Sequence, residues 1–258
     1  MVRGYIDISQ GQVHYREAGD GQPLVLLHQS PSSSAMWEAV IPVFAECGFR
    51  TVAFDMPGYG MSDPPDKEPT LDDYAEWTFE ACDALGFRRP HLFGHHTGGS
   101  IAIKMAYLRP AGVGKIAIWG VPLLDNNMAQ ALATEEAPIY DKDATEIIRF
   151  WKSRAQYSGA AYTERIGLRN LIEMLQAGPI RPYGHRAVGK TDHEPLIANL
   201  PVPLLALAGD REMLQPASQQ AAQMAPDGQY VSLGDVGIDV ADEASELLVE
   251  VVTKFLSR

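Results

Sequence analysis

His96 is placed where its side chain could act as a nucleophile or a general base without a second catalytic residue. His96 lies in the run Gly94-His95-His96-Thr97-Gly98-Gly99, which directly follows the apolar residues 90–93. Glycines around a residue at the end of an apolar strand predict a sharp turn into a helix, with the central side chain held up at the strand end. A neutral imidazole has a free lone pair near neutral pH. His96 could therefore attack a carbonyl, or act as a general base on water or on a substrate C–H or O–H.

The elements that must position His96 alternate between strands and helices. Leu24 to Leu27 is a continuous apolar run, typical of a parallel strand that is buried on both faces. Thr70 and Asp73 predict a capping box at the start of a helix that ends near Leu85. Strands are expected at 4–9, 12–17, 24–27, 51–54, 91–93, 115–119, 203–207 and 229–233, and helices at 34–47, 70–85, 97–108, 217–224 and 242–256. The first two strands are expected to form an antiparallel edge. The whole pattern predicts an α/β fold with a mostly parallel eight-stranded sheet, covered by helices on both faces.

Residues 121–200 break this alternation. Their periodicity is helical, with helices expected at 146–151 and 163–177. Because ligands in open α/β sheets bind outside the carboxyl ends of the strands, we expect this segment to form a helical cap over that edge. The sequence therefore predicts one domain, residues 1–258, with a cap inserted at about 121–200.

Composition narrows the class of partner. The net charge of −12 argues against nucleic acid and against anionic membrane surfaces, both of which attract clustered Lys and Arg. No apolar run approaches the length of a signal peptide core or a membrane span, so a cytoplasmic protein is expected. Cys47 and Cys82 fall in expected helices without metal-like spacing, which favours two reduced, buried thiols. A small-molecule substrate is the expected partner, and no pattern specifies an oligomeric state.

Four motifs in order along the chain resemble those of the α/β-hydrolase family. The run from Gly94 has the form of its nucleophile elbow, G-x-S-x-G, with histidine in place of serine. The other three are Leu26-Leu27-His28-Gln29-Ser30-Pro31, Phe54-Asp55-Met56-Pro57-Gly58-Tyr59-Gly60-Met61-Ser62 and Ala208-Gly209-Asp210-Arg211-Glu212. The chain is most similar to a subgroup with a Gly-His-His-Thr-Gly elbow. The resemblance covers nearly the whole chain and implies the α/β-hydrolase fold.

The resemblance also implies a serine nucleophile, a base histidine and an acid, and this chain departs from that set. The serine position falls on His96, and the base position falls on Ile238. The acid position falls on Glu212, with Asp210 as a competitor, and some members of the family place the acid where Asp125 stands. The serine triad is therefore absent. Glu212, Asp125 or Asp239 could instead orient His96, as an acid orients a triad histidine.

Backbone oxyanion donors do not depend on the side chain at position 96. The family pattern implies the N–H groups of Thr97 and Gln29, which could hold a carbonyl oxygen. Ser30 and His28 belong to the same loop. Both are candidates to contact the substrate, and His28 is also expected to support the loop. A serine run such as residues 30–34 is usually turn and capping chemistry.

Other polar side chains have weaker positions. His95 is expected to pack away from the site. Metal ligation by His28, His95 and His96 is not expected, because adjacent elbow side chains diverge. No phosphate-binding or dinucleotide motif occurs, so we expect no cofactor. Four residues of the inserted segment are candidates to line a substrate pocket: Trp151, Tyr183, His185 and His193.

Three functions remain open at this stage. The first is a cofactor-free hydrolase that acts on an ester, lactone or activated ketone through His96. The second is a lyase, decarboxylase, cyclase or isomerase in which His96 moves a proton and the backbone donors hold an enolate. The third is a non-catalytic binder of small molecules, in which histidine only tolerates the strained backbone of the elbow.

Overall fold

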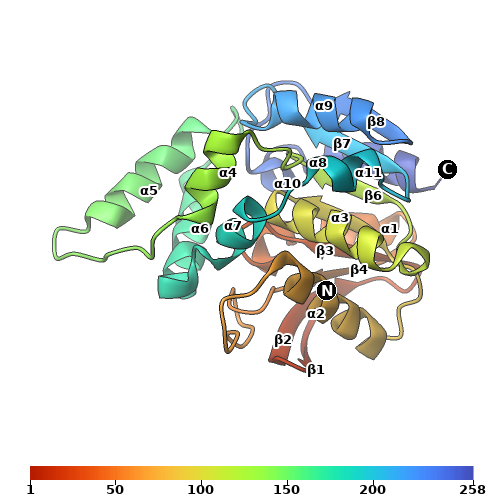
Figure 1. Cartoon of the computed structure of the whole chain (residues 1–258), viewed down its shortest axis with the longest axis horizontal. Coiled ribbons are helices and arrows are strands. Elements are labelled where there is room, and N and C mark those ends of the chain that lie inside the picture. The colour runs from red at the N-terminus through yellow and green to blue at the C-terminus, as the bar shows by residue number, and fades with distance from the viewer. Residues whose placement is uncertain (258) are drawn as a thin grey trace.

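The computed structural model describes residues 1–257, and its centre is an eight-stranded sheet. The strands lie in the order β1-β2-β4-β3-β5-β6-β7-β8 (Figure 1). Their bounds are β1 Val2–Ile8, β2 Gly11–Ala18, β3 Gln22–Leu27, β4 Phe49–Phe54, β5 His91–His95, β6 Ile116–Trp119, β7 Leu204–Ala208 and β8 Gly228–Ser232. The pairs β1–β2 and β2–β4 are antiparallel and all others are parallel, which confirms the mostly parallel sheet with an antiparallel edge.

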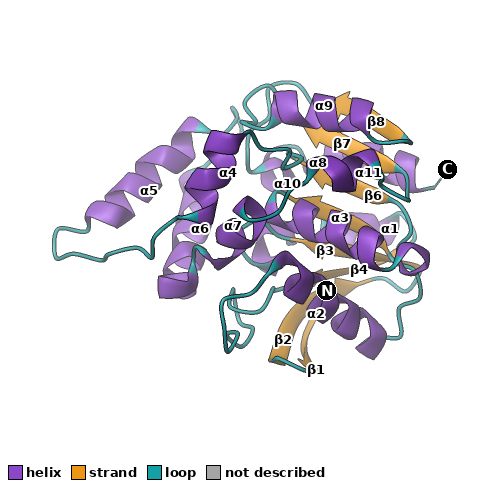
Figure 2. Cartoon of the chain, in the orientation of Figure 1, coloured by secondary structure: helices purple, strands orange, loops and turns teal. Residues whose placement is uncertain are grey.

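Helices cover both faces of this sheet (Figure 2). One face packs against α2 (Leu71–Ala84), α3 (Thr97–Leu108), α8 (Glu194–Ala198) and α9 (Gln215–Met224). The other packs against α1 (Ile41–Glu46), α10 (Val240–Glu243) and α11 (Ser245–Leu256). Alternate residues of β3 pack into the hydrophobic cores on the two faces of the sheet, because successive strand side chains point to opposite faces. The side chains of Leu24 to Leu27 are all fully buried, so this stretch of the strand is apolar.

The first helix of the core is shorter than expected. A 3₁₀ turn, η1 (Ser34–Trp37), is followed by α1, whose first turn contains Pro42. Proline lacks a backbone N–H and suits the first turn of a helix, so a new helix begins there. The helix then ends before Cys47, and Gly48 follows with a φ of 90°. Cys47 is exposed at this turn, so the prediction of two buried thiols is wrong for Cys47 and confirmed for Cys82.

Between β6 and β7 the described chain contains only helices. They are α4 (Asn126–Ala133), α5 (Thr145–Gln156), α6 (Glu164–Ala177), the 3₁₀ turn η3 (Gly178–Ile180), α7 (Tyr183–Gly189) and α8. Helices α4 to α7 extend to one side of the sheet, at the left of Figure 1, and we call them the inserted helices. Helix α8 packs instead against α3 and α9. Within residues 1–257, no helix has the length and apolar character needed to cross a bilayer.

Candidate functional site

His96 occupies a strained turn between β5 and α3. Its backbone has a φ of 44° and a ψ of −106°, a conformation that non-glycine residues rarely adopt. The His96 N–H donates to the carbonyl oxygen of Trp119 at 3.1 Å, which ties the turn to β6. At Gly98 a Cβ atom would overlap the backbone of Leu27, so α3 can approach β3 this closely only with glycine there. The turn therefore holds the imidazole at the carboxyl end of the sheet.

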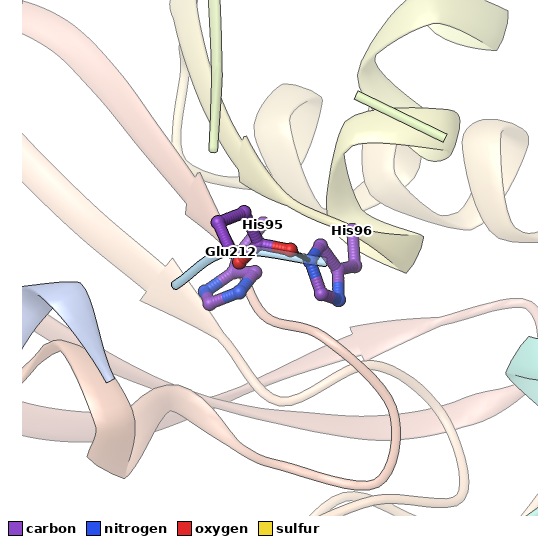
Figure 3. A group of neighbouring side chains, drawn as sticks. All are labelled: His95, His96 and Glu212. Carbon is purple, nitrogen blue, oxygen red and sulfur yellow. Dashed lines mark hydrogen bonds and ion pairs between the residues drawn. The ribbon is translucent and has the colours of Figure 1, made fainter. Parts of the chain in front are cut away.

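The imidazole is paired with one carboxylate. His96 Nε2 lies 2.9 Å from Glu212 Oε1, and the Glu212 side chain is fully buried (Figure 3). Trp119 Nε1 donates to Glu212 Oε2 at 2.9 Å, and the Leu214 N–H donates to Oε1 at 3.1 Å. A carboxylate with these donors accepts hydrogen bonds, so Nε2 carries the proton in this contact and Nδ1 holds the free lone pair. Within residues 1–257, His96 Nδ1 forms no hydrogen bond.

The donors around Glu212 keep it ionised in spite of its burial. Burial raises the pKa of the Glu212 carboxyl. The His96 imidazole and the hydrogen bonds from Leu214 and Trp119 lower that pKa, and together they outweigh the effect of burial. The net pKa lies below the ordinary value of a glutamate. Glu212 is thus a carboxylate at neutral pH, able to stabilise a positive charge on His96.

Gly120 provides the space for this pair. It lies directly after β6 with a φ of 65°, which favours glycine. A Cβ atom at Gly120 would overlap the His96 ring, and it would lie 3.3 Å from the Glu212 carboxyl carbon. The absence of a side chain at this position therefore allows the imidazole to reach its carboxylate.

A cavity of 340 Å³ lies against His96 and is mostly apolar. Its floor comes from the elbow and from the loop after β3, and much of its wall comes from the inserted helices. The lining side chains are Gln29, Ser30, Pro31, His96, Thr97, Pro122, Leu124, Met128, Leu132, Phe150, Ser153, Arg154, Tyr157, His185, Val188, Met213, Leu214 and Ile238. Such a cavity fits a small, largely apolar compound with a few polar atoms.

The loop after β3 stands beside the elbow, as the sequence predicts. The Ser30 N–H lies 3.3 Å from Thr97 Oγ1, which joins the loop to the start of α3. Within the described chain, the Gln29 N–H has no hydrogen-bond acceptor, and Thr97 is the first residue of α3, where a helical N–H has no partner in its own helix. His28 Nδ1 donates to the Gln29 carbonyl at 2.8 Å, and His28 Nε2 accepts from the Met56 N–H. The His28 ring is buried and supports the loop.

A second imidazole–carboxylate pair joins α7 to the segment that follows α4. His185 of α7 lies with Nδ1 2.5 Å from Glu135 Oε2 and with Nε2 3.1 Å from the Ser30 carbonyl. Both partners are acceptors, so only a doubly protonated ring satisfies both contacts at once. His185 thus connects an inserted helix to the loop that carries Gln29.

The other two candidate carboxylates lie apart from His96. Asp125 accepts from the Met128 N–H at 2.8 Å and caps the N-terminus of α4. Asp239 is buried and binds Arg154 Nη2 at 2.6 Å and Asn170 Nδ2 at 3.0 Å. Of the three candidates, Glu212 is the one that contacts His96.

Of the remaining positions that the sequence analysis considers, one lines the cavity and three do not. Ile238 lines the cavity, so an apolar side chain stands where the family pattern places its base. Trp151 on α5 and Tyr183 on α7 are not among the lining residues. His193 contacts Ser100 Oγ at 2.8 Å, between α8 and α3, and burial lowers its pKa to about 4.

His95 is fully buried, but it does not diverge from its neighbour. Its ring packs edge-on to that of His96, with centroids 4.5 Å apart (Figure 3). Neither ring nitrogen of His95 has a hydrogen-bond partner among the described residues. Burial lowers the pKa of His95 well below its usual value, so the ring is neutral.

Several lining residues are absent from the sequence-based predictions. Leu124, Met128 and Leu132 repeat every four residues, a spacing that could have indicated one face of a helix. Arg154 also lines the cavity, and its Nε and Nη2 atoms bind Asp239. No local signal marks Arg154, because its partner is 85 residues away.

Comparison with known families and structures identifies the fold. Residues 22–148 match the family model described as alpha/beta hydrolase fold. A bromoperoxidase from Bacillus anthracis superposes with a TM-score of 0.82 at 18% identity, covering 100% of both chains. An enol-lactonase from Burkholderia xenovorans LB400 superposes with a TM-score of 0.76 at 18% identity, over 99% of this chain and 100% of the other. These likenesses confirm the α/β-hydrolase fold.

One curated relative matches over nearly its full length. It is a 2-hydroxy-6-oxononadienedioate/2-hydroxy-6-oxononatrienedioate hydrolase from a Pseudomonas species, 23% identical over 281 aligned positions. The alignment covers 98% of this chain and 96% of that protein. The shared region therefore includes the elbow, the loop after β3 and the inserted helices.

Proposed function

We propose that this chain, which has the α/β-hydrolase fold, is a hydrolase-like enzyme that acts on a small carbonyl compound through His96, without a cofactor. An ester, a lactone or an activated ketone is the proposed substrate class. The names of the Pseudomonas hydrolase and the Burkholderia enol-lactonase, both of which denote carbonyl compounds, support this class. The inserted helices are the proposed cap over the substrate.

One observation carries the proposal: His96 Nε2 binds Glu212 while Nδ1 stays free in a residue that lines the cavity. A serine at this position would need a second residue to remove its proton, whereas the imidazole is itself a base. Glu212 fixes the tautomer that leaves Nδ1 unprotonated. Replacement of the family serine by His96 and of the family base by Ile238 therefore gives a coherent one-histidine site.

The proposed reaction begins with a water molecule between Nδ1 and the substrate carbonyl. As the water oxygen attacks the carbonyl carbon, its proton passes to Nδ1, and the buried Glu212 carboxylate stabilises the imidazolium. The proton then passes to the leaving oxygen or carbon as the tetrahedral intermediate collapses. Nδ1 thereby loses the proton that it took from water, and His96 is neutral again at the end of the reaction.

The negative oxygen of the intermediate is assigned to the N–H groups of Gln29 and Thr97. Their lack of protein acceptors supports this role, because both are free to bind an incoming oxygen. Removing one such donor in hydrolases costs about 3–4 kcal/mol of transition-state stabilisation. The apolar wall of the cavity would strengthen these contacts by excluding water.

A second candidate function is proton abstraction without hydrolysis, as in a lyase, decarboxylase, cyclase or isomerase. The observation that favours it is Ile238, which makes the cavity wall apolar where a water-activating histidine would stand. A single base that removes a substrate proton, with an enolate held by the backbone donors, needs no second histidine. Products distinguish the two: hydrolysis incorporates an oxygen atom from water.

The test is to assay wild type, His96→Ala and His96→Ser on a panel of esters, lactones and β-keto acids. We expect wild type to turn over at least one compound, and both variants to lose roughly 10³-fold or more in kcat/KM. Hydrolysis in water enriched in the heavy oxygen isotope then separates the two candidates by product mass.

A serine-directed phosphonate probe provides the control, because it should leave wild type unlabelled. Labelling at any serine, with activity retained in His96→Ala, would refute the assignment of His96. If wild type turns over nothing in the panel but binds panel compounds, the chain is a binding protein.

A further inference from the structure

We propose that His95, His96 and Glu212 form a binding site for a divalent transition metal ion, with Zn²⁺ as the probe. We further propose that metal bound there blocks the base chemistry of His96. The second part rests on the proposed function, whereas the first does not. The site uses His95, a residue that the mechanism above leaves without a role.

The three side chains converge on one volume. Each offers one ligand atom, and these atoms all lie within 4.8 Å of one another (Figure 3). Tetrahedral zinc with ligand distances of 2.0–2.2 Å separates its ligand atoms by about 3.3–3.6 Å. His96 Nε2 and Glu212 Oε1 need to part by only a few tenths of an ångström from their 2.9 Å contact. Two histidines and a glutamate are also a ligand set that catalytic zinc sites use.

His95 gives an independent reason to place a ligand here. Its side chain is fully buried, yet neither ring nitrogen has a hydrogen-bond partner among the described residues. Leaving a buried polar atom unpaired costs about 1–3 kcal/mol, so such atoms call for an explanation. A metal ion would bond to one of them. Moving the His95 ring toward a metal would also break no hydrogen bond.

The surroundings of Glu212 resemble the outer shell of a metal site. Trp119 Nε1 donates to the oxygen that does not face His96, which fixes the plane of the carboxylate. Hydrogen bonds of this kind orient ligands, and their loss typically weakens metal affinity 10–100-fold. Gly120 leaves space beside both the His96 ring and the Glu212 carboxyl group. The site is therefore oriented and has room for small movements.

Metal binding would change the free ring nitrogen of His96, Nδ1, from an acceptor to a donor. In the metal-free pair the single proton of neutral His96 is on Nε2. A metal on Nε2 displaces that proton, and the neutral ring then carries it on Nδ1. Nδ1 becomes a donor and can no longer accept a proton. Bound metal is thus expected to inhibit, and chelation to restore, any activity that depends on His96.

The experiment measures Zn²⁺ binding by competition with a chromophoric chelator, on untagged full-length protein. We expect one Zn²⁺ per chain for wild type and at least tenfold weaker binding for His95→Phe, His95→Asn and Glu212→Gln. Two His95 variants are used so that a folding defect in one does not decide the result, and thermal unfolding confirms that each is folded. Co²⁺ absorption provides a second readout, since nitrogen and oxygen ligands in a tetrahedron give intense visible bands.

Inhibition is measured separately from binding. On any substrate that wild type turns over, Zn²⁺ should inhibit wild type, and His95→Phe should retain its metal-free activity but resist Zn²⁺. No Zn²⁺ binding to wild type, or binding that is unchanged in both His95 variants, would overturn the site. Binding at this site without inhibition would overturn the second part alone. A lack of any activity would count against the proposed function and would leave the binding result intact.

Discussion

Two imidazole–carboxylate pairs contribute to one cavity, and they differ in how fully each ring is used. In the elbow pair, His96–Glu212, one ring nitrogen binds the carboxylate and the other is free. In the inserted pair, His185–Glu135, one nitrogen binds the carboxylate and the other binds the Ser30 carbonyl. The carboxylate of the elbow pair is fully buried, whereas that of the inserted pair is 24% exposed.

The difference lies in what surrounds each ring, because the side-chain types are the same. A ring with both nitrogens occupied by acceptors holds two segments together and has no lone pair to offer. A ring with one nitrogen free, and the other fixed by a buried carboxylate, is a positioned base. We therefore infer that the elbow pair does chemistry and that the inserted pair fastens α7 to the loop after β3.

The largest expected effect comes from Glu212→Gln, which tests the elbow pair. Both Glu212 oxygens accept hydrogen bonds, but an amide has only one acceptor, so its NH₂ group must face a donor. If it faces His96, the ring proton is driven to Nδ1 and the base is lost. We expect kcat to fall by roughly 10²–10⁴-fold with little change in KM, measured on a substrate of the wild type.

Asp125→Asn is the matched control for that variant. Asp125 caps α4, and asparagine caps a helix about as well as aspartate. We expect kcat within about twofold of wild type, since the change should be nearly neutral. Equal losses in the Glu212 and Asp125 variants would contradict the assignment of Glu212 as the partner of His96.

A second test displaces the His96 ring without changing its chemistry. Gly120→Ala adds a methyl group that overlaps the ring, at a backbone φ of 65°. We expect kcat/KM to fall roughly 10²-fold, because small displacements of catalytic groups have effects of that size. The free energy of unfolding should fall by about 1–3 kcal/mol from the strained backbone.

Gly86→Ala is the control that separates the effect of backbone strain from the effect of contact with the His96 ring. Gly86 has a φ of 72°, but a Cβ atom there meets no other atom within 4 Å. Chemical denaturation should show a similar loss of stability, and kinetic assays should show unchanged activity. If Gly86→Ala lowers kcat as much as Gly120→Ala, the effect of Gly120 is global and carries no information about His96.

The sequence predicts the elbow pair far better than the inserted pair. The strands, the glycines around His96 and the capping box of Thr70 with Asp73 are local patterns, and the structure has all of them. Glu212 could be named as a candidate because the resemblance fixes its place after β7. Its selection over Asp125 and Asp239 needs side-chain positions that no local pattern contains.

The inserted helices show why the rest could not be predicted. His185 could be named only as one of several polar residues, since its partners Glu135 and Ser30 are 50 and 155 residues away. No local pattern marks Arg154 either, because its partner Asp239 is 85 residues away. The expected divergence of His95 and His96 fails because the strained turn brings adjacent rings together edge-on. Pairing across the fold is a tertiary property, whereas periodicity reports only the secondary structure.

The inserted pair is tested by His185→Gln and Glu135→Gln. Each removes one part of the contact between α7 and the Ser30 carbonyl, so the loop that carries Gln29 is held less firmly. We expect kcat/KM to fall about tenfold for each, which corresponds to about 1.4 kcal/mol. The double variant should be no worse than either single one, because residues of one hydrogen-bonded pair act as a unit. Additive losses, or a loss as large as that of Glu212→Gln, would remove the distinction between the pairs.

The smallest expected effect concerns Glu173 of α6, a buried carboxyl that has no histidine partner. Glu173 Oε1 accepts from Ser33 Oγ at 2.6 Å, whereas Oε2 has no hydrogen-bond partner among the described residues and lies 3.9 Å from Arg169 Nε. Burial raises the pKa of Glu173 from 4.5 to about 7, and Arg169 and Ser33 offset this only in part. Glu212 is just as deeply buried, and its donors lower its pKa instead.

Stability should therefore depend on pH through Glu173 in a defined direction. Between the ordinary pKa of 4.5 and about 7, the folded state holds a proton that the unfolded state has released. Stability falls as pH rises wherever the folded state binds more protons, so this contribution is lost as the pH passes through about 7. Glu173→Gln keeps the acceptor for Ser33 and removes the ionisation. Urea unfolding at pH 6 and pH 8 should show wild type losing about 1 kcal/mol relative to the variant. The same pH dependence in both proteins would mean that the Glu173 carboxyl is paired in solution, and that burial alone does not separate it from Glu212.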